Sequence, residues 1–183
     1  NMSGLVVIPS KFKGVPVTKI DRGAFADCKS IKSLMIPKCV VEIGEGAFKG
    51  CSSLTELNLN SFVTPNALNM SNLFKDCFNL RSLDLAAFKT EEVKDMSSMF
   101  SGCKKLTELY ISSLRTPKVE YMNEMFSFCE NLIHLDTQFL ETDSVLEMRG
   151  MFMGCAKIES LNVENFNTQK YPISVKCFRI ALG

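Results

Sequence analysis

The sequence lacks several features that mark common functional classes. It has no cluster of basic residues, and with a net charge of +1 and 22% charged residues it offers little attraction for a nucleic-acid backbone. No stretch approaches the roughly 18 uninterrupted apolar residues that a membrane-spanning helix needs. We therefore expect no nucleic-acid partner and no membrane insertion of this segment. No secretory signal is visible at Asn1, which we interpret as a mature or trimmed form rather than as evidence for the cytosol.

What the sequence does contain is an internal repeat. A cysteine recurs after one interval of 23 residues and four intervals of 26, at Cys28, Cys51, Cys77, Cys103, Cys129 and Cys155. A phenylalanine stands three residues before each cysteine, and apolar residues follow at three, six and eight, as in Phe100, Leu106, Leu109 and Ile111. A period of about 20–29 residues carrying L-x-x-L-x-L is the signature of a leucine-rich solenoid.

We predict an α/β fold: a right-handed leucine-rich repeat solenoid with a parallel β-sheet on its concave face and turns or short helices on its convex face. Because the repeats are continuous, the sequence predicts a single domain over residues 1–183. Its repeats would cover 23–168, with a cap hairpin at 1–22 and a decayed last repeat at 169–183. In the hairpin, LVVIP and VPVTKI would flank SKFKG and hide the apolar end of the stack.

The 26-residue units carry an apolar pattern before each cysteine. Its residues are spaced three, three, one and three apart: Val93, Met96, Met99, Phe100 and Cys103. This is one face of a helix, so we expect a short helix there, with Leu68 as the first residue of the equivalent face one unit earlier. A threonine precedes each pattern and would cap the helix, although it could instead form hydrogen bonds along the stack. These threonines are Thr64, Thr90, Thr116, Thr142 and Thr168.

All eight cysteines occupy core positions of the repeat, including Cys39 and Cys177 outside the main column. Equivalent residues of stacked coils lie about 4.8 Å apart, but their Cβ vectors run parallel, a poor match to disulfide geometry. We predict buried free thiols, with disulfides as the alternative, and the redox compartment stays open.

These units resemble a known family. IPSKFKGVPVTKIDRGAFADC and IPKCVVEIGEGAFKGC resemble the BspA-like leucine-rich repeats of bacterial surface proteins. NMSNLFKDC, DMSSMFSGC, YMNEMFSFC and EMRGMFMGC resemble the Met-Phe-Gly-Cys repeats often found beside them. The two patterns cover about residues 5 to 168, with departures at the glycine slot (Asp27, Asp76, Phe128) and at a strand slot (Thr137). The resemblance implies a secreted or cell-surface protein that binds other macromolecules, often in adhesion, without naming the partner.

Residues between the buried leucines should point outward on the concave face, because successive strand residues face opposite sides. This face is polar and mildly acidic, and we expect it to bind a protein or a glycan, of a host or the extracellular matrix. Tyr110 and His134 are the leading candidates, since tyrosine is enriched at interface hot spots. The other predicted binding residues are Glu56, Asn58, Asp84, Glu108 and Asp136. The alternative is a merely solvated face, with the tyrosine lying against Glu108.

The sequence predicts no catalytic residue, metal or cofactor. Cys129 should point into the core while His134 points out, so the two would not form a nucleophile–base pair. Asp84 and Asp136 would stand about 9–10 Å apart, too far to share one Ca²⁺. Two rival functions stay open: a structural spacer and a glycan-cleaving groove. Asp84 and Glu108, or Glu108 and Asp136, would lie about 7–8 Å apart, within the range of inverting glycosidases, and parallel β-helix enzymes use such a groove. The expected helices argue against this, because a coil of a β-helix would consist of strands throughout.

Overall fold

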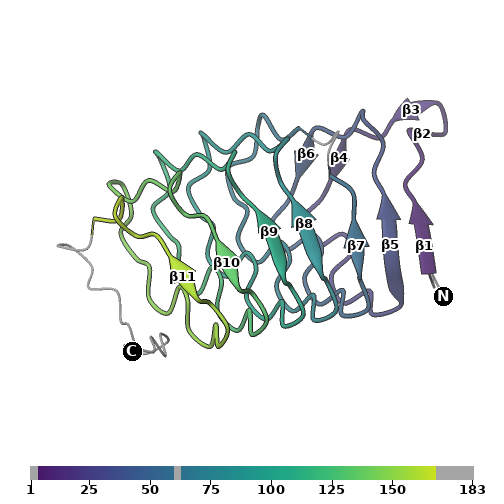
Figure 1. Ribbon diagram of the computed structural model, residues 1–183. Coiled ribbons are helices and arrows are strands. Elements are labelled where there is room, and N and C mark those ends of the chain that lie inside the picture. The colour runs from purple at the N-terminus through teal and green to yellow at the C-terminus, as the bar shows by residue number, and fades with distance from the viewer. Residues whose placement is uncertain (1–3, 60–62, 168–183) are drawn as a thin grey trace.

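The computed structural model describes residues 4–59 and 63–167, and these form a stack of coils that run parallel to one another (Figure 1). One strand of each coil lies on the same side of the stack, the predicted concave face. These strands are β1 (Gly4–Val7), β5 (Ile31–Met35), β7 (Glu56–Leu57), β8 (Ser82–Asp84), β9 (Glu108–Tyr110), β10 (His134–Leu135) and β11 (Ser160–Leu161). The pairs β1–β5–β7, β8–β9 and β10–β11 are all parallel. The predicted leucine-rich solenoid with a parallel sheet is confirmed.

A second, shorter line of parallel pairing follows another side of the coil. It begins with β4 (Lys19–Ile20) beside β6 (Glu42–Ile43) and continues as single-residue bridges from Asn69 through Asp95 and Tyr121 to Glu147. Near the N-terminus, β2 (Lys11–Phe12) and β3 (Val15–Pro16) form a hairpin through Lys13 and Gly14, both with positive φ. The run LVVIP does not pair with VPVTKI as expected, because its residues form β1 and extend the concave sheet instead.

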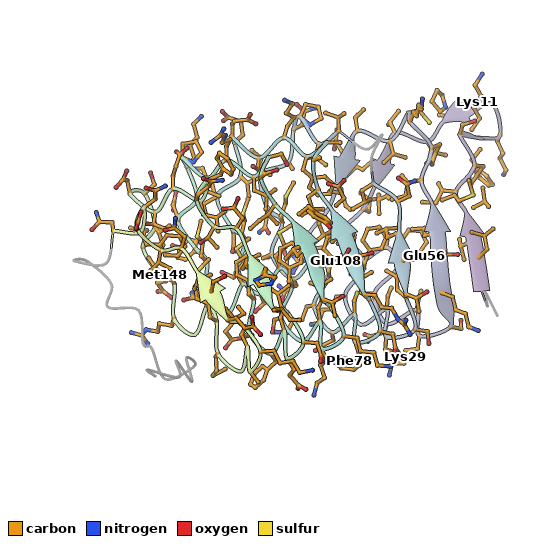
Figure 2. All side chains as sticks on the ribbon, viewed as in Figure 1. Lys11, Lys29, Glu56, Phe78, Glu108 and Met148 are labelled. Carbon is orange, nitrogen blue, oxygen red and sulfur yellow. The ribbon has the colours of Figure 1, made fainter. Side chains whose placement is uncertain are left out.

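Columns of side chains from equivalent repeat positions fill the interior of the stack (Figure 2). The phenylalanine rings from Phe25 to Phe152 stack on one another with centroids 5.5–5.8 Å apart. Phe166, which lies outside the phenylalanine slot of the repeat, adds a ring 6.4 Å from Phe152. Leucines and methionines at the other repeat positions are buried beside this ladder. The core is therefore built from contacts between equivalent residues of successive coils.

The prediction of short helices before the cysteines is wrong. These segments form turns, which were the other structure predicted for the convex face. Among the described residues there is no helix, and so none that could cross a membrane. The backbone N–H groups before each cysteine alternate between two kinds of partner. Leu73 donates to the carbonyl of Met70 within a turn, whereas Asn72 donates to the carbonyl of Ser97 in the next coil.

Two physical reasons exclude helices here. An α-helix directs its N–H groups to the fourth preceding residue and would leave none for the neighbouring coil. Packed helices also need about 8–10 Å between their axes, roughly twice the 4.8 Å spacing of hydrogen-bonded coils. The apolar spacing fits the turns equally well, with one exception. Leu68 is 62% exposed, and Ala67, which stands 26 residues before the buried Val93, takes the core position.

The threonine column forms hydrogen bonds along the stack, as in the alternative to helix capping. The buried hydroxyl of Thr116 donates to the carbonyl of Glu141 at 2.8 Å and accepts from the Glu141 N–H at 2.6 Å. Thr64 and Thr90 make the same pair of bonds to the residue 25 positions later. Thr168 lies outside the described residues. Each of these hydroxyls therefore satisfies two backbone groups of the neighbouring coil.

Replacing Thr116 with valine should lower the free energy of unfolding by about 2–3 kcal/mol. The shape is kept, but the N–H and C=O of Glu141 lose their only hydroxyl partner inside the stack. Thr107→Val is the matched control, because the exposed Thr107 hydroxyl also donates to a neighbouring coil, at Arg81. We expect less than about 1 kcal/mol there, since water can replace that bond. Urea unfolding of both variants measures the difference, and equal losses would contradict a special role for the buried column.

The seven described cysteines are free thiols, five of them buried and two, Cys28 and Cys39, half-buried. The buried thiols donate to the phenylalanine carbonyl of the preceding coil, as Cys103 does to Phe74 at 3.2 Å. The same bond recurs at Cys51, Cys77, Cys129 and Cys155. The prediction of free thiols is confirmed for these residues, and Cys177 lies outside the described part of the chain.

Packing between coils explains why Asp27, Asp76 and Phe128 replace the glycine that the family pattern has just before the cysteine. All six residues just before the main-column cysteines have φ between 56° and 76°. Glycine alternates there with a larger residue, and each larger side chain lies over the glycine of the next coil. A Cβ on Gly102 would come within 2.5 Å of Asp76 Oδ1, and one on Gly154 within 2.6 Å of the Phe128 ring. Asp27, Asp76 and Phe128 therefore fill the space that the glycines leave.

Candidate functional site

All seven predicted binding residues lie on the concave face. Glu56, Asp84, Glu108, Tyr110 and His134 belong to strands β7 to β10, while Asn58 and Asp136 follow their strands directly. All are exposed except Asp84, which is half-buried. The leucines between them are buried, so the expected alternation of inward and outward residues is observed.

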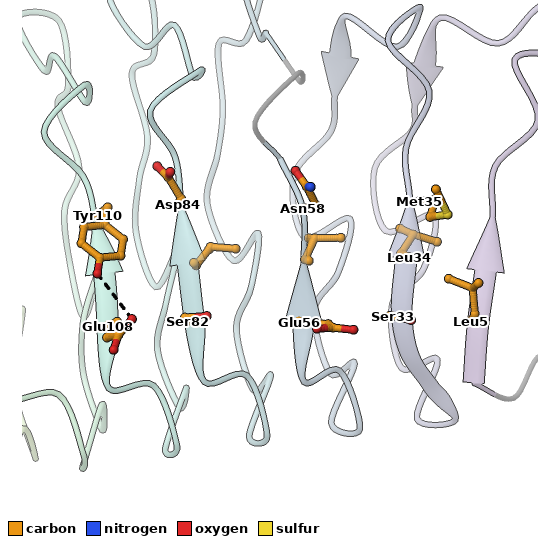
Figure 3. Close-up of a pocket in the computed structure, with 12 residues that line it drawn as sticks. Leu5, Ser33, Leu34, Met35, Glu56, Asn58, Ser82, Asp84, Glu108 and Tyr110 are labelled. Atoms are coloured by element: carbon orange, nitrogen blue, oxygen red, sulfur yellow. Dashed lines mark hydrogen bonds between the residues drawn. The ribbon is translucent and has the colours of Figure 1, made fainter.

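The structure divides these residues between two grooves. Glu56, Asn58, Asp84, Glu108 and Tyr110 line the first, where they stand in two rows across the strands (Figure 3). The other two, His134 and Asp136, line a second groove with residues of β11 and the segment that follows it. The two leading candidates, Tyr110 and His134, therefore belong to different grooves on the same face.

The aspartates of this face also stabilise the fold. Asp84 Oδ1 accepts a hydrogen bond from the Ala86 N–H at 2.8 Å, and Asp136 Oδ1 accepts one from the Gln138 N–H at 3.1 Å. Such Asx turns end the strand by replacing a backbone turn with a side chain. Sequence reasoning missed this second role, although an aspartate or asparagine recurs at this repeat position, as at Asp84, Asp136 and Asn162.

Tyr110 is the large aromatic side chain at the edge of the first groove. Its hydroxyl donates to Glu108 Oε2 at 3.4 Å, a long bond to a residue two positions away on the same strand. The ring nevertheless remains 56% exposed, beside Asp84 on the neighbouring strand. The contact with Glu108 expected of a merely solvated face is thus present, and it leaves the ring open to a partner.

Three apolar residues of the concave face were missed by the sequence reasoning. Leu5 and Val7 of β1 and Met35 of β5 point outward and are 58%, 59% and 57% exposed. Leu5 pairs with Ser33 and Val7 with Met35 across the two strands. Met35 follows Cys28 at the same offset as Asn58 follows Cys51, and that spacing could have identified it.

Four acidic residues of this face form no ion pair within the described residues. Glu56, Asp84, Glu108 and Asp136 take part in none of the six ion pairs found among the described residues. Those pairs lie elsewhere on the coils, as between Lys94 and Glu120. The concave face therefore carries uncompensated negative charge.

Nucleophilic chemistry finds no support in this geometry. Cys129 is fully buried and donates its thiol to the Phe100 carbonyl, whereas His134 is exposed on the outer face. Burial also raises the pKa of Cys129 well above 9.0, so that it holds its proton. Within residues 4–59 and 63–167, no three histidine, cysteine or acidic side chains are grouped so that they could hold a metal ion.

Solved structures with similar coils are leucine-rich repeat proteins of bacteria. A leucine-rich repeat protein of T. pallidum is 23% identical with a TM-score of 0.54, and the match covers 84% of this chain and 77% of that one. A leucine-rich cell surface protein of Faecalibacterium prausnitzii is 28% identical with a TM-score of 0.51, over 70% of this chain and 30% of that one. A leucine-rich repeat protein of Eubacterium ventriosum is 20% identical with a TM-score of 0.58, over 90% and 45%.

The chain thus spans most of the first protein but less than half of the other two. These similarities confirm the leucine-rich fold and the predicted resemblance to repeats of bacterial surface proteins. No curated protein matches the sequence. One family model, described as a Mycoplasma protein of unknown function, DUF285, matches residues 42–166 and 110–181. Because these matches cover well over half of the sequence, the chain belongs to the DUF285 family.

Proposed function

We propose that this chain is a non-catalytic recognition module of a secreted or cell-surface protein. It binds a protein or glycan, such as a component of a host or of the extracellular matrix, through the concave face. The observation that carries this proposal is the first groove, where Tyr110 stays exposed beside carboxylates that form no ion pair among the described residues. Similarity to a surface protein of F. prausnitzii supports the location.

The test is a binding screen of matrix proteins and glycans with two single variants, Tyr110→Ala and His134→Ala. A partner in the first groove should bind about 10- to 30-fold more weakly to Tyr110→Ala, the range of a hot-spot tyrosine. Loss on His134→Ala alone would place the partner in the second groove. Tyr121→Ala is the matched control, because Tyr121 is 36% exposed on another side of the coil.

Three results would overturn the proposal. Binding that neither variant affects would move the site away from the concave face. No binding at high concentration would favour a structural spacer. The objection to glycan cleavage that rested on helices no longer holds, so the screen should include a polysaccharide panel. Release of reducing ends, lost on Asp84→Asn or Glu108→Gln, would replace recognition with hydrolysis.

A further inference from the structure

An apolar patch adjoins the first groove at its N-terminal end. It consists of Leu5, Val7 and Met35, which lie on the paired strands β1 and β5 and are each more than half exposed. Leu5 and Met35 also line the groove itself (Figure 3). Soluble proteins seldom expose neighbouring large apolar side chains without a use, and such patches mark interaction sites. The patch therefore belongs to the same surface as the proposed binding residues.

The groove changes in character along the stack. After the apolar patch come Glu56 on β7, Asp84 on β8 and Glu108 on β9, and the groove ends at the ring of Tyr110. No lysine or arginine lines it, and its carboxylates join none of the ion pairs of the described residues. An occupant complementary to this order is apolar at one end and positively charged along the rest.

We propose that the first groove binds an extended basic segment of a protein, with an apolar residue on the patch and lysines or arginines over the carboxylates. This rests on the proposed function and narrows its partner to a polypeptide. Met35 and Tyr110 are three coils apart, about 14 Å, a span of four or five extended residues. The Tyr110 ring at the far end can accept an arginine or lysine against its face. A sulfated or neutral glycan would leave the patch uncovered and the carboxylates without a counter-charge.

A selection from a random dodecapeptide library against the immobilised chain tests this inference. Selected peptides should be rich in lysine and arginine and should carry leucine, isoleucine, valine or methionine toward one end. Their binding should weaken by about tenfold for Glu56→Gln/Glu108→Gln and for Leu5→Ser/Met35→Ser. Raising the ionic strength to about 1 M, where the screening length is about 3 Å, should also weaken it.

Matched controls change the same chemistry elsewhere on the surface. Glu91→Gln/Asp143→Asn removes two exposed charges outside the groove, and Leu68→Ser/Met153→Ser removes two exposed apolar side chains. Both controls should bind the selected peptides as the wild type does. Acidic or uncharged selected peptides, or equal binding by groove variants and controls, would overturn the proposal.

Failure of this inference is separable from failure of the proposed function. If the library yields no enrichment while a matrix protein or glycan binds in a Tyr110-dependent manner, only the basic segment is wrong. If neither the library nor the matrix screen yields a partner, the recognition function itself fails.

Discussion

Raising the pH from 8 to 10 is expected to lower the free energy of unfolding by about 5–6 kcal/mol. Burial, and then the charge of neighbouring thiols in the column, raises the pKa of Cys77, Cys103 and Cys129 well above the ordinary value of 9.0. Above pH 9 these thiols ionise in the unfolded chain but stay protonated in the folded one, so stability falls as the pH rises. Each contributes about 1.4 kcal/mol at pH 10, one unit above 9.0. Burial also raises the pKa of Cys51, to about 12, so four thiols together give about 5–6 kcal/mol.

The measurement is urea unfolding at pH 8, 9 and 10 in the presence of a reductant. Cys103→Val provides the control, because it removes one thiol while keeping a buried side chain of similar size. This variant loses the bond to the Phe74 carbonyl and is less stable at every pH, so the slope with pH is the informative quantity. Between pH 8 and pH 10, the stability lost by this variant should be about 1.4 kcal/mol smaller than the stability lost by the wild type. Identical slopes would show that the buried thiols do not control alkaline unfolding.

Phe100→Ala is expected to lower the free energy of unfolding by about 4 kcal/mol. Phe100 is fully buried and stacks between Phe74, with centroids 5.8 Å apart, and Phe126, 5.5 Å away. Truncation removes the transfer free energy of the ring and leaves a cavity between two coils that hydrogen bonds hold in place. It also removes two aromatic contacts.

Phe78→Ala is the matched control for this substitution. Phe78 follows the core cysteine of its unit and is 39% exposed at the edge of the stack, where Figure 2 labels it. Its loss should lower the free energy of unfolding by about 1 kcal/mol. Urea unfolding of both variants at neutral pH gives the comparison, and similar losses would mean that the phenylalanine ladder adds nothing beyond ordinary apolar burial.

The repeat phase was sufficient to predict the core but not the path of the backbone. Spacing from Cys103 identifies the buried Phe100 and Leu106, because side-chain burial follows directly from a repeated coil. It does not reveal whether an N–H bonds within its own coil or to the next. Glycine or asparagine marks one such turn at Gly46, Asn72 and Gly150, but Ser98 and Glu124 adopt positive φ at the same slot, so the residue signal is incomplete in the middle units.

On the concave face, too, some features could be predicted from the sequence and others could not. Alternation along a strand is a local property, so it correctly placed Asp84 and Tyr110 outside the core. Leu5 is as apolar as a core residue and precedes the first repeat cysteine, so only the pairing register between β1 and β5 shows that it points outward. That register depends on residues 27 or more positions apart, which pattern reasoning within one repeat does not reach.

The alternating hydrogen bonds that replace the helices have a mechanical consequence. Coils are joined to their neighbours on both sides by bonds that run along the axis of the stack, as from Phe74 to Met99. A pulling force between the two ends passes through every coil in turn, but a terminal coil has a neighbour on one side only and should therefore peel away first. Each 26-residue coil that peels away would add about 85 Å of chain. Under tension the solenoid would therefore lengthen in regular steps and limit the force that reaches a bound contact.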